Sequence, residues 1–327
     1  MEDGWLKPST GRDNRFKWWG GRKDKKFLNE AAGRLKHPGF LEISHTPKFR
    51  IPRDSKVFTI GSCFARNIER KLMENGVEVL SRGLVPHHDT YRATDADPNA
   101  AMNKFTPHSI SHEMSRALGG ETPPDRGLID AGDGLWWDPQ ASFTMPTSRE
   151  AVLAIRDQIE AITRRVDEAD VVLITLGLTE TWLDSETGIY LNGQPSGAVL
   201  TRYPDRFKFA NVTHDQAVQA LRDTLSLVRQ HGKPGVKFIL TVSPVALAQT
   251  FTMRDVIVAN SHSKAVLLSA IDGFVSVDED VDYFPSFEMV MYSPRQLAWE
   301  EDQRHVTDAM VGHVTDFFVQ EYLSEAR

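Results

Sequence analysis

Two hydrophobic patterns alternate along the chain from residue 56 onward. Short apolar runs rich in β-branched and aromatic residues predict buried strands at 56–60, 77–80, 170–177, 236–244 and 274–277. Between and after them, apolar residues spaced three and four apart predict amphipathic helices at 65–76, 149–169, 214–232, 261–273 and 304–323. This alternation predicts an α/β fold, a three-layer α/β/α sandwich with a mostly parallel, flavodoxin-like sheet.

Two segments depart from this pattern. Residues 1–50 mix cations with aromatic side chains and predict an N-terminal extension, which either contacts an anionic surface or packs its aromatic rings on the body. Residues 81–148 are rich in Pro, Gly, His and Asp and predict an insertion after the second strand, which could cover a site. The main domain therefore spans 51–327.

The charge distribution narrows the choice of partners. The net charge is −7, yet residues 1–50 hold 12 of the 38 lysines and arginines and only 6 of the 45 acidic residues. An acidic body argues against nucleic-acid binding. A single cysteine excludes an internal disulfide, and no apolar run has the length of a signal peptide or a membrane span, so the sequence predicts a cytoplasmic protein without a membrane span.

Polar residues follow the predicted strands where a parallel sheet places its ligands. The first strand ends at Gly61-Ser62-Cys63, the next central strand leads into residues 177–180, and Ser243 follows the third. Asp302 and His305 lie three residues apart near the start of the last predicted helix, so they would share one face of it.

A serine between a strand and a helix suits a nucleophile. Gly61 permits an unusual backbone angle, and the helix N-terminus offers N–H groups to an oxyanion. Serine needs a base, which His305 oriented by Asp302 would supply. Cys63 is the rival nucleophile, because a helix N-terminus and a nearby histidine lower a thiol pKa; the alternative is a small buried side chain. The residues by themselves leave the choice between Ser62 and Cys63 open.

The segment "TIGSCFA" at 59–65 resembles the motif of the GSCFA family, which is itself similar to the SGNH hydrolase superfamily. Further segments resemble that family in the expected order: "TLGLTETWLDSETGIYLNGQP" at 175–195, "VSPVALAQTFTMRDVIVANSHSK" at 242–264, "DYFPSFE" at 282–288 and "DQRHV" at 302–306. The resemblance therefore covers about residues 56–306.

This resemblance implies roles for individual positions. Ser62 matches the SGNH nucleophile, and Asp302 and His305 match the orienting acid and the base. Where that superfamily has a Gly-x-Asn-Asp block, this chain has Gly177 and, in place of the asparagine, Thr179. The backbone of Ser62, Gly177 and Thr179 are then the expected oxyanion donors, with Asn103 as a further candidate oxyanion or substrate contact.

Other side chains are candidates for substrate binding. Glu180 would order the oxyanion loop or bind a sugar hydroxyl, or else pair with an arginine. Trp182, two residues later, is a second candidate for substrate binding. Aromatic planes bind sugars, so Trp136 and Trp137 could lie over the cleft, although hairpin core is an equal alternative. His88 could line the site. Lys264 could bind a substrate anion or be solvated.

The sequence therefore predicts a serine-dependent ester hydrolase or O-acyltransferase that needs no cofactor and acts on an acylated sugar or glycan precursor. The alternative is a catalytically inactive glycan- or nucleotide-sugar-binding module. A third, weaker hypothesis is a metal-dependent hydrolase built on His108 and His112, which have helical ligand spacing but lack the glutamate of an HExxH motif. The oligomeric state is left open.

Overall fold

The computed structural model describes residues 14–20, 30–85, 97–120 and 127–324. In these ranges the central sheet has five parallel strands, in the spatial order β2 (Glu78–Val79), β1 (Lys56–Gly61), β5 (Val171–Leu176), β9 (Lys237–Val242) and β10 (Val281–Tyr283). Ranked along the chain, this is the order 2-1-3-4-5 of the flavodoxin-like doubly wound sheet. The order reverses between β1 and β5, so the sheet has its switch point there.

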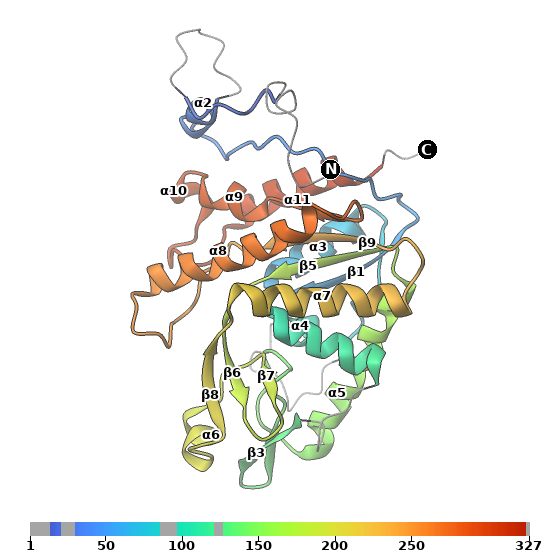
Figure 1. The fold of residues 1–327 in the computed structure, drawn as a ribbon, viewed down its shortest axis with the longest axis vertical. Coiled ribbons are helices and arrows are strands. Elements are labelled where there is room, and N and C mark those ends of the chain that lie inside the picture. Colours follow the sequence, from blue (N-terminus) through green and yellow to red (C-terminus); the bar gives the residue numbers. More distant parts are fainter. Residues whose placement is uncertain (1–13, 21–29, 86–96, 121–126, 325–327) are drawn as a thin grey trace.

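Both faces of the sheet are covered by helices. Along β5, Val171 and Leu173 point to one face while Val172 and Ile174 point to the other, because successive strand residues alternate. The first face is covered by α3 (Cys63–Glu74), α9 (Ser286–Met291) and α11 (Asp308–Tyr322), and the second by α4 (Pro107–Met114), α7 (His214–His231) and α8 (Val256–Val275) (Figure 1). The predicted three-layer α/β/α sandwich is confirmed.

The predicted helices occur, with differences at their ends. Helix α5 (Arg149–Arg164) is followed by a short 3₁₀ turn, η5 (Arg165–Glu168). Helix α11 begins at Asp308 with Thr307 as its N-cap. The expectation that Asp302 and His305 share a helix face is therefore wrong, because both precede the helix in a turn.

The strand predicted at 274–277 is also wrong. Phe274 and Val275 form the last turn of α8 and pack against the core there. The edge strand is β10, which begins four residues later and pairs with β9. A short apolar run that ends an amphipathic helix has no periodicity of its own, so tertiary packing decided its conformation.

A second, antiparallel region follows β5 and was not predicted. Strand β6 (Glu180–Asp184) pairs with β7 (Ile189–Leu191) on one side and β8 (Phe207–Asn211) on the other. The short helix α6 (Gly197–Arg202) joins β7 to β8, and the hairpin of β3 (Ile129–Gly132) and β4 (Leu135–Trp137) lies nearby, beyond α7 and α4 (Figure 1). The remaining short helices are α2 (Ala31–Leu35), η2 (Pro98–Met102), η3 (Ser115–Gly119) and α10 (Arg295–Ala298).

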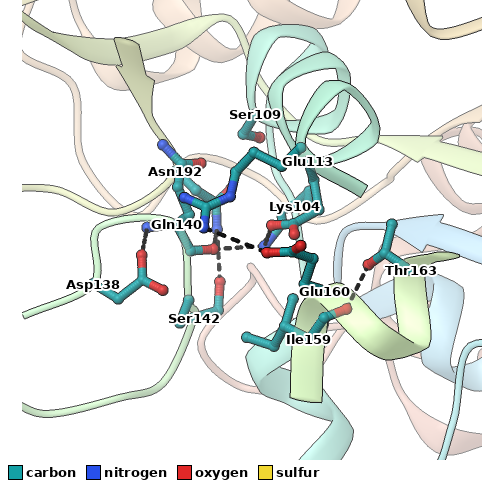
Figure 2. Close-up of polar contacts among 12 residues, drawn as sticks. Lys104, Ser109, Glu113, Asp138, Gln140, Ser142, Ile159, Glu160, Thr163 and Asn192 are labelled. Carbon is teal, nitrogen blue, oxygen red and sulfur yellow. Dashed lines mark hydrogen bonds and ion pairs between the residues drawn. The ribbon is translucent and has the colours of Figure 1, made fainter. Parts of the chain in front are cut away.

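A buried ionic network anchors the described part of the 81–148 segment to α5. The Arg156 guanidinium binds both carboxylate oxygens of Glu113 at 2.8 Å and Asp138 at 2.6–2.7 Å. Lys104 contacts the same Glu113 at 3.0 Å and donates to the Gln140 carbonyl at 2.6 Å (Figure 2). The network joins α4, α5 and the chain after β4, so this segment is part of the folded body.

The described part of residues 1–50 ends against the body. Phe40, Ile43 and Phe49 pack on the core beneath α11, and Lys48 donates its backbone N–H to Asp282 at 3.0 Å. Trp19 is 68% exposed. No helix in the described ranges is long and apolar enough to cross a membrane.

Candidate functional site

A cavity of about 530 Å³ opens at the carboxyl ends of β1, β5 and β9. Its lining includes Ser62, Gly177, Ser243 and His305, which come from four different parts of the chain. It therefore lies beside the switch point of the sheet, where ligands of doubly wound folds bind.

The backbone around Ser62 is built to present its hydroxyl. Gly61 has φ of +139°, and a Cβ there would lie 2.2 Å from the Thr175 carbonyl oxygen. Ser62 is the N-cap of α3, yet its side chain makes no capping hydrogen bond. Its Oγ is buried and has no hydrogen-bond partner among the described residues. The serine thus forgoes the usual structural role of an N-cap hydroxyl.

Three further buried polar atoms in this region have no hydrogen-bond partner in the part of the chain that the structure describes. The Ser243 hydroxyl also lines the cavity, and Thr175 Oγ1 lies on the neighbouring strand, opposite Gly61 in the register. Asn103 Oδ1 is the third of these atoms. The backbone at this position is held beside β1 by a hydrogen bond from the Lys104 N–H to the Gly61 carbonyl. Buried polar groups are normally paired, so this concentration indicates the position of a polar ligand or water.

Asp302 and His305 form a hydrogen-bonded pair. The Asp302 carboxylate lies 2.5 Å from His305 Nδ1, and its other oxygen accepts the backbone N–H groups of Arg304 and His305 at 2.9 Å each. These backbone N–H groups, followed by the imidazole, lower the pKa of Asp302 to about 2. The carboxylate is therefore ionised at neutral pH and favours the tautomer with the proton on Nδ1.

Ser62 and His305 line the same cavity but form no hydrogen bond with each other. His305 Nε2 instead lies 3.0 Å from Nη1 of Arg304, whose Nε donates to the Ala246 carbonyl at 3.1 Å. A guanidinium can only donate, so Nε2 accepts, in agreement with the proton on Nδ1. The lone pair that a base would use is present but is occupied by Arg304.

The expected oxyanion donors are engaged elsewhere. The N–H of Ser62 donates to the Thr175 carbonyl at 3.0 Å, and that of Gly177 to the Phe105 carbonyl at 2.9 Å. Thr179 donates its N–H to Ser263 Oγ at 2.8 Å and its hydroxyl to Asn211 at 2.7 Å.

Backbone carbonyls therefore use the N–H groups of Ser62 and Gly177, and two side chains use the donors of Thr179, so none of these expected oxyanion donors is free in the structure. Asn103 does not line the cavity. In the first turn of α3, which has no side-chain cap, the N–H groups of Cys63 and Phe64 interact with the Cys63 sulfur and donate to no oxygen among the described residues.

The Cys63 thiol lines the cavity but is not activated. Burial raises its pKa, and this effect outweighs the opposing influence of Arg304 and Lys264. A thiol with a raised pKa holds little thiolate at neutral pH, whereas the prediction of Cys63 as the rival nucleophile assumed a lowered pKa.

Lys264 on α8 is neither solvated nor open to a substrate. Its ammonium is buried and donates to the carbonyls of Gly177 at 2.6 Å and Val245 at 2.8 Å. Burial lowers its pKa to about 7. The side chain thus fixes two loops of the cavity wall relative to each other.

Glu180 and Trp182 line the cavity, as the substrate-binding prediction requires of them. The Glu180 carboxylate accepts the Thr250 hydroxyl at 2.6 Å and the Phe251 N–H at 3.0 Å, so it orders the 250–251 loop. The ring of Trp182 meets Phe209 and Phe251 edge to face, at centroid distances of 5.9 and 5.1 Å. These three rings make one end of the cavity apolar.

The other predicted substrate contacts lie elsewhere. Trp137 is buried in a separate cluster with Phe207, and Trp136 stacks against the Arg149 guanidinium at 5.4 Å. Neither lines the Ser62 cavity, because the β3–β4 hairpin packs on the antiparallel region. The predicted contact through His88 lies outside the described residues.

His108 and His112 line a separate cavity of about 380 Å³. Burial lowers the pKa of His112 to about 4. Within the described ranges no cluster of three or more His, Cys, Asp and Glu side chains could hold a metal ion. The third hypothesis, a metal-dependent hydrolase, therefore gains no support from this pair.

Ser243 and Arg304 are polar residues of the cavity to which the sequence prediction gave no role. Ser243 follows β9 directly, and its position at a strand end was the available signal. Arg304 stands between Asp302 and His305 in the "DQRHV" segment, but its contact with the imidazole depends on the turn conformation.

Comparison with curated proteins finds no match. The family model described as "GSCFA family" matches residues 56–318, which include every strand of the central sheet and all the polar residues described above. This match spans well over half of the chain. The chain therefore belongs to the GSCFA family.

Proposed function

We propose that this protein is a serine-dependent ester hydrolase or O-acyltransferase. One observation carries the proposal: a buried Ser62 hydroxyl without a hydrogen-bond partner among the described residues and His305, which is hydrogen-bonded to Asp302, line one cavity at the switch point of the sheet. The resemblance to SGNH hydrolases, in which serine, aspartate and histidine occupy corresponding positions, supports the same assignment.

In the proposed reaction Ser62 Oγ attacks the ester carbonyl while its proton passes to His305 Nε2. The tetrahedral intermediate collapses, the bond between the carbonyl carbon and the alcohol oxygen breaks, and His305 returns the proton to the departing alcohol. Water, or an acceptor hydroxyl, then attacks the acyl-serine in the same way and frees Ser62. Asp302 orients the imidazole and stabilises its cationic form.

The oxyanion requires donors other than those expected from the sequence. We assign this role to the N–H of Cys63, at the positive end of α3, and to the hydroxyl of Ser243. Cys63 follows Ser62 in the chain, and Ser243 lines the same cavity at the end of β9, with β5 between β9 and β1.

The substrate we propose is an acylated sugar or glycan precursor. The aromatic end formed by Trp182, Phe209 and Phe251 would receive the acyl group, since these three rings offer apolar surface. The choice of a sugar alcohol rests on the superfamily resemblance alone.

Labelling with a fluorophosphonate tests the proposal directly. The probe should modify the wild-type protein at Ser62, and Ser62→Ala should abolish both labelling and ester turnover while its unfolding transition stays within about 1 kcal/mol of wild type. Cys63→Ala is the matched control and should keep both. Labelling that persists in Ser62→Ala and disappears in Cys63→Ala would transfer the role to the thiol.

A non-catalytic binding module is the second candidate. The observation that favours it is the Arg304 contact, which occupies the His305 nitrogen that a base needs. A binding module would stay unlabelled at Ser62 and would bind glycan or nucleotide-sugar ligands equally well after Ser62→Ala.

A further inference from the structure

The guanidinium of Arg304 holds a position that a structural arginine does not need. It lines the cavity, contacts His305 Nε2 at 3.0 Å, and donates to only one backbone carbonyl, that of Ala246 at 3.1 Å. Within the described ranges it forms an ion pair with no carboxylate. An arginine at the wall of a cavity without a carboxylate partner is suited to bind an anion.

The carboxylates nearest in the site are already engaged. Asp302 accepts two backbone N–H groups and the His305 imidazole, and Glu180 accepts the Thr250 hydroxyl and the Phe251 N–H. The charge of Arg304 also reaches the cavity interior, because it lowers the pKa of Lys264 and opposes the raised pKa of Cys63. The cavity thus has an aromatic end and a cationic end.

The position of Arg304 specifies which part of an ester would meet it. In the proposed reaction His305 Nε2 delivers its proton to the departing alcohol oxygen, so the alcohol part lies on the His305 side of the cavity. Arg304 contacts that same nitrogen. A group bound by Arg304 therefore belongs to the alcohol part and not to the acyl chain.

We propose that Arg304 selects esters whose alcohol part carries a carboxylate or phosphate. Binding of this anion draws the guanidinium away from His305 Nε2 and frees the lone pair for Ser62. A neutral ester lacks this effect and finds the base occupied. The inference rests on the proposed function and deepens it by naming the class of alcohol.

Three acetyl esters test the selection: 4-acetoxybenzoate, its neutral counterpart 4-acetoxybenzamide, and 4-acetoxyphenyl phosphate. Comparison of kcat/KM ratios between wild type and Arg304→Gln cancels the intrinsic reactivity of each ester. The anionic-to-neutral ratio should fall about 10- to 100-fold in Arg304→Gln, as expected for the loss of a charged hydrogen bond, and Arg304→Lys should restore part of it. The two anionic esters distinguish a carboxylate from a phosphate.

A second signature separates selection from a merely structural role. Turnover of the neutral ester should rise severalfold in Arg304→Gln, because His305 Nε2 is then free. Arg254→Gln, which removes an exposed arginine that does not line the cavity, is the matched control and should leave the ratio at its wild-type value. Equal losses for anionic and neutral esters in Arg304→Gln would overturn the inference, as would an unchanged ratio.

Calorimetric binding of 4-hydroxybenzoate and phenyl phosphate, with phenol as the neutral reference, gives a readout that needs no turnover. Anion binding that disappears in Arg304→Gln would support the anion site even if Ser62 is never labelled, in which case only the proposed function fails. Labelling of Ser62 without any anion preference or anion binding would sink the inference and leave the proposed function standing.

Discussion

Ser62 is an N-cap residue that does not cap. A serine at this position normally accepts an N–H from the first helical turn and stabilises the helix by about 1 kcal/mol. Here the hydroxyl makes no such contact while the residue lines a cavity, and the close approach of strand β5 at Gly61 fixes the chain that carries it. The residue gives up a stabilising contact, which is typical of a functional position.

The oxyanion assignment leads to a test at the scale of single residues. Ser243→Ala should lower kcat for an ester about 100-fold, because it removes one donor to the developing oxyanion. Thr179→Val should leave kcat unchanged and destabilise the fold by about 1 kcal/mol, because the lost hydroxyl is bonded to Asn211. Steady-state kinetics and urea unfolding of both variants check this. A large kcat effect of Thr179→Val with none for Ser243→Ala would restore the assignment expected from the sequence.

At the scale of elements, a buried ionic network holds the segment between β2 and α5 in place. Arg156 is fully buried with Glu113 and Asp138 as its partners. Lys104 is buried beside the same glutamate, as Figure 2 shows. Loss of one member leaves the others unpaired in a low dielectric, which costs more than the pair contributes. The network thus fixes where α4 and the chain after β4 lie relative to α5.

Two arginines of α5 provide a matched comparison. Arg156→Met should lower the free energy of unfolding by about 3–5 kcal/mol, because two carboxylates lose their buried partner. The Arg164 side chain is 59% exposed and pairs with Glu160. Arg164→Met removes this exposed pair and should lower the free energy of unfolding by less than about 1 kcal/mol. Urea unfolding measures both values. Similar losses in the two variants would contradict the role given to the network.

At the scale of the whole molecule, chain order assembles the site. Residues near 62, 177, 243 and 305 meet because β1, β5 and β9 are adjacent and parallel, so their carboxyl ends share one edge. The order reversal between β1 and β5 leaves a gap in the helical cover at that edge. A cavity at this place is a consequence of the doubly wound topology.

Global stability should depend on pH through a buried histidine. Burial lowers the pKa of His112 to about 4, and Arg156, Arg116 and Lys104 act in the same direction against Glu113. The unfolded chain therefore takes up this proton first, and the free energy of unfolding falls as pH falls from about 6.5 to 4.

The measurement is urea unfolding of wild type and His112→Gln at pH 7 and pH 4.5. Wild type should lose about 2 kcal/mol more than the variant over this interval, because glutamine binds no proton. Equal losses would show that His112 is not buried in its neutral form.

The hydrophobic periodicity by itself determined the layers of this protein. The apolar run at 170–177 is typical of a strand buried on both faces, and the strong amphipathic pattern of 214–232 is typical of a helix that covers a sheet. The polar residues at the strand ends followed from the same pattern. The error at 274–277 arose where a short apolar run fits the end of a helix as well as a strand.

Only the tertiary structure decided which polar atoms of the site are free of other hydrogen bonds and therefore available to a substrate. Gly177 and Thr179 lie at a strand end, as the sequence indicated, but backbone and side-chain contacts from distant segments use their donors. Ser243 and Arg304 reach the cavity through packing between strands and through a turn. Hydrogen bonding between residues far apart in the chain depends on positions in space, which no local pattern of residues encodes.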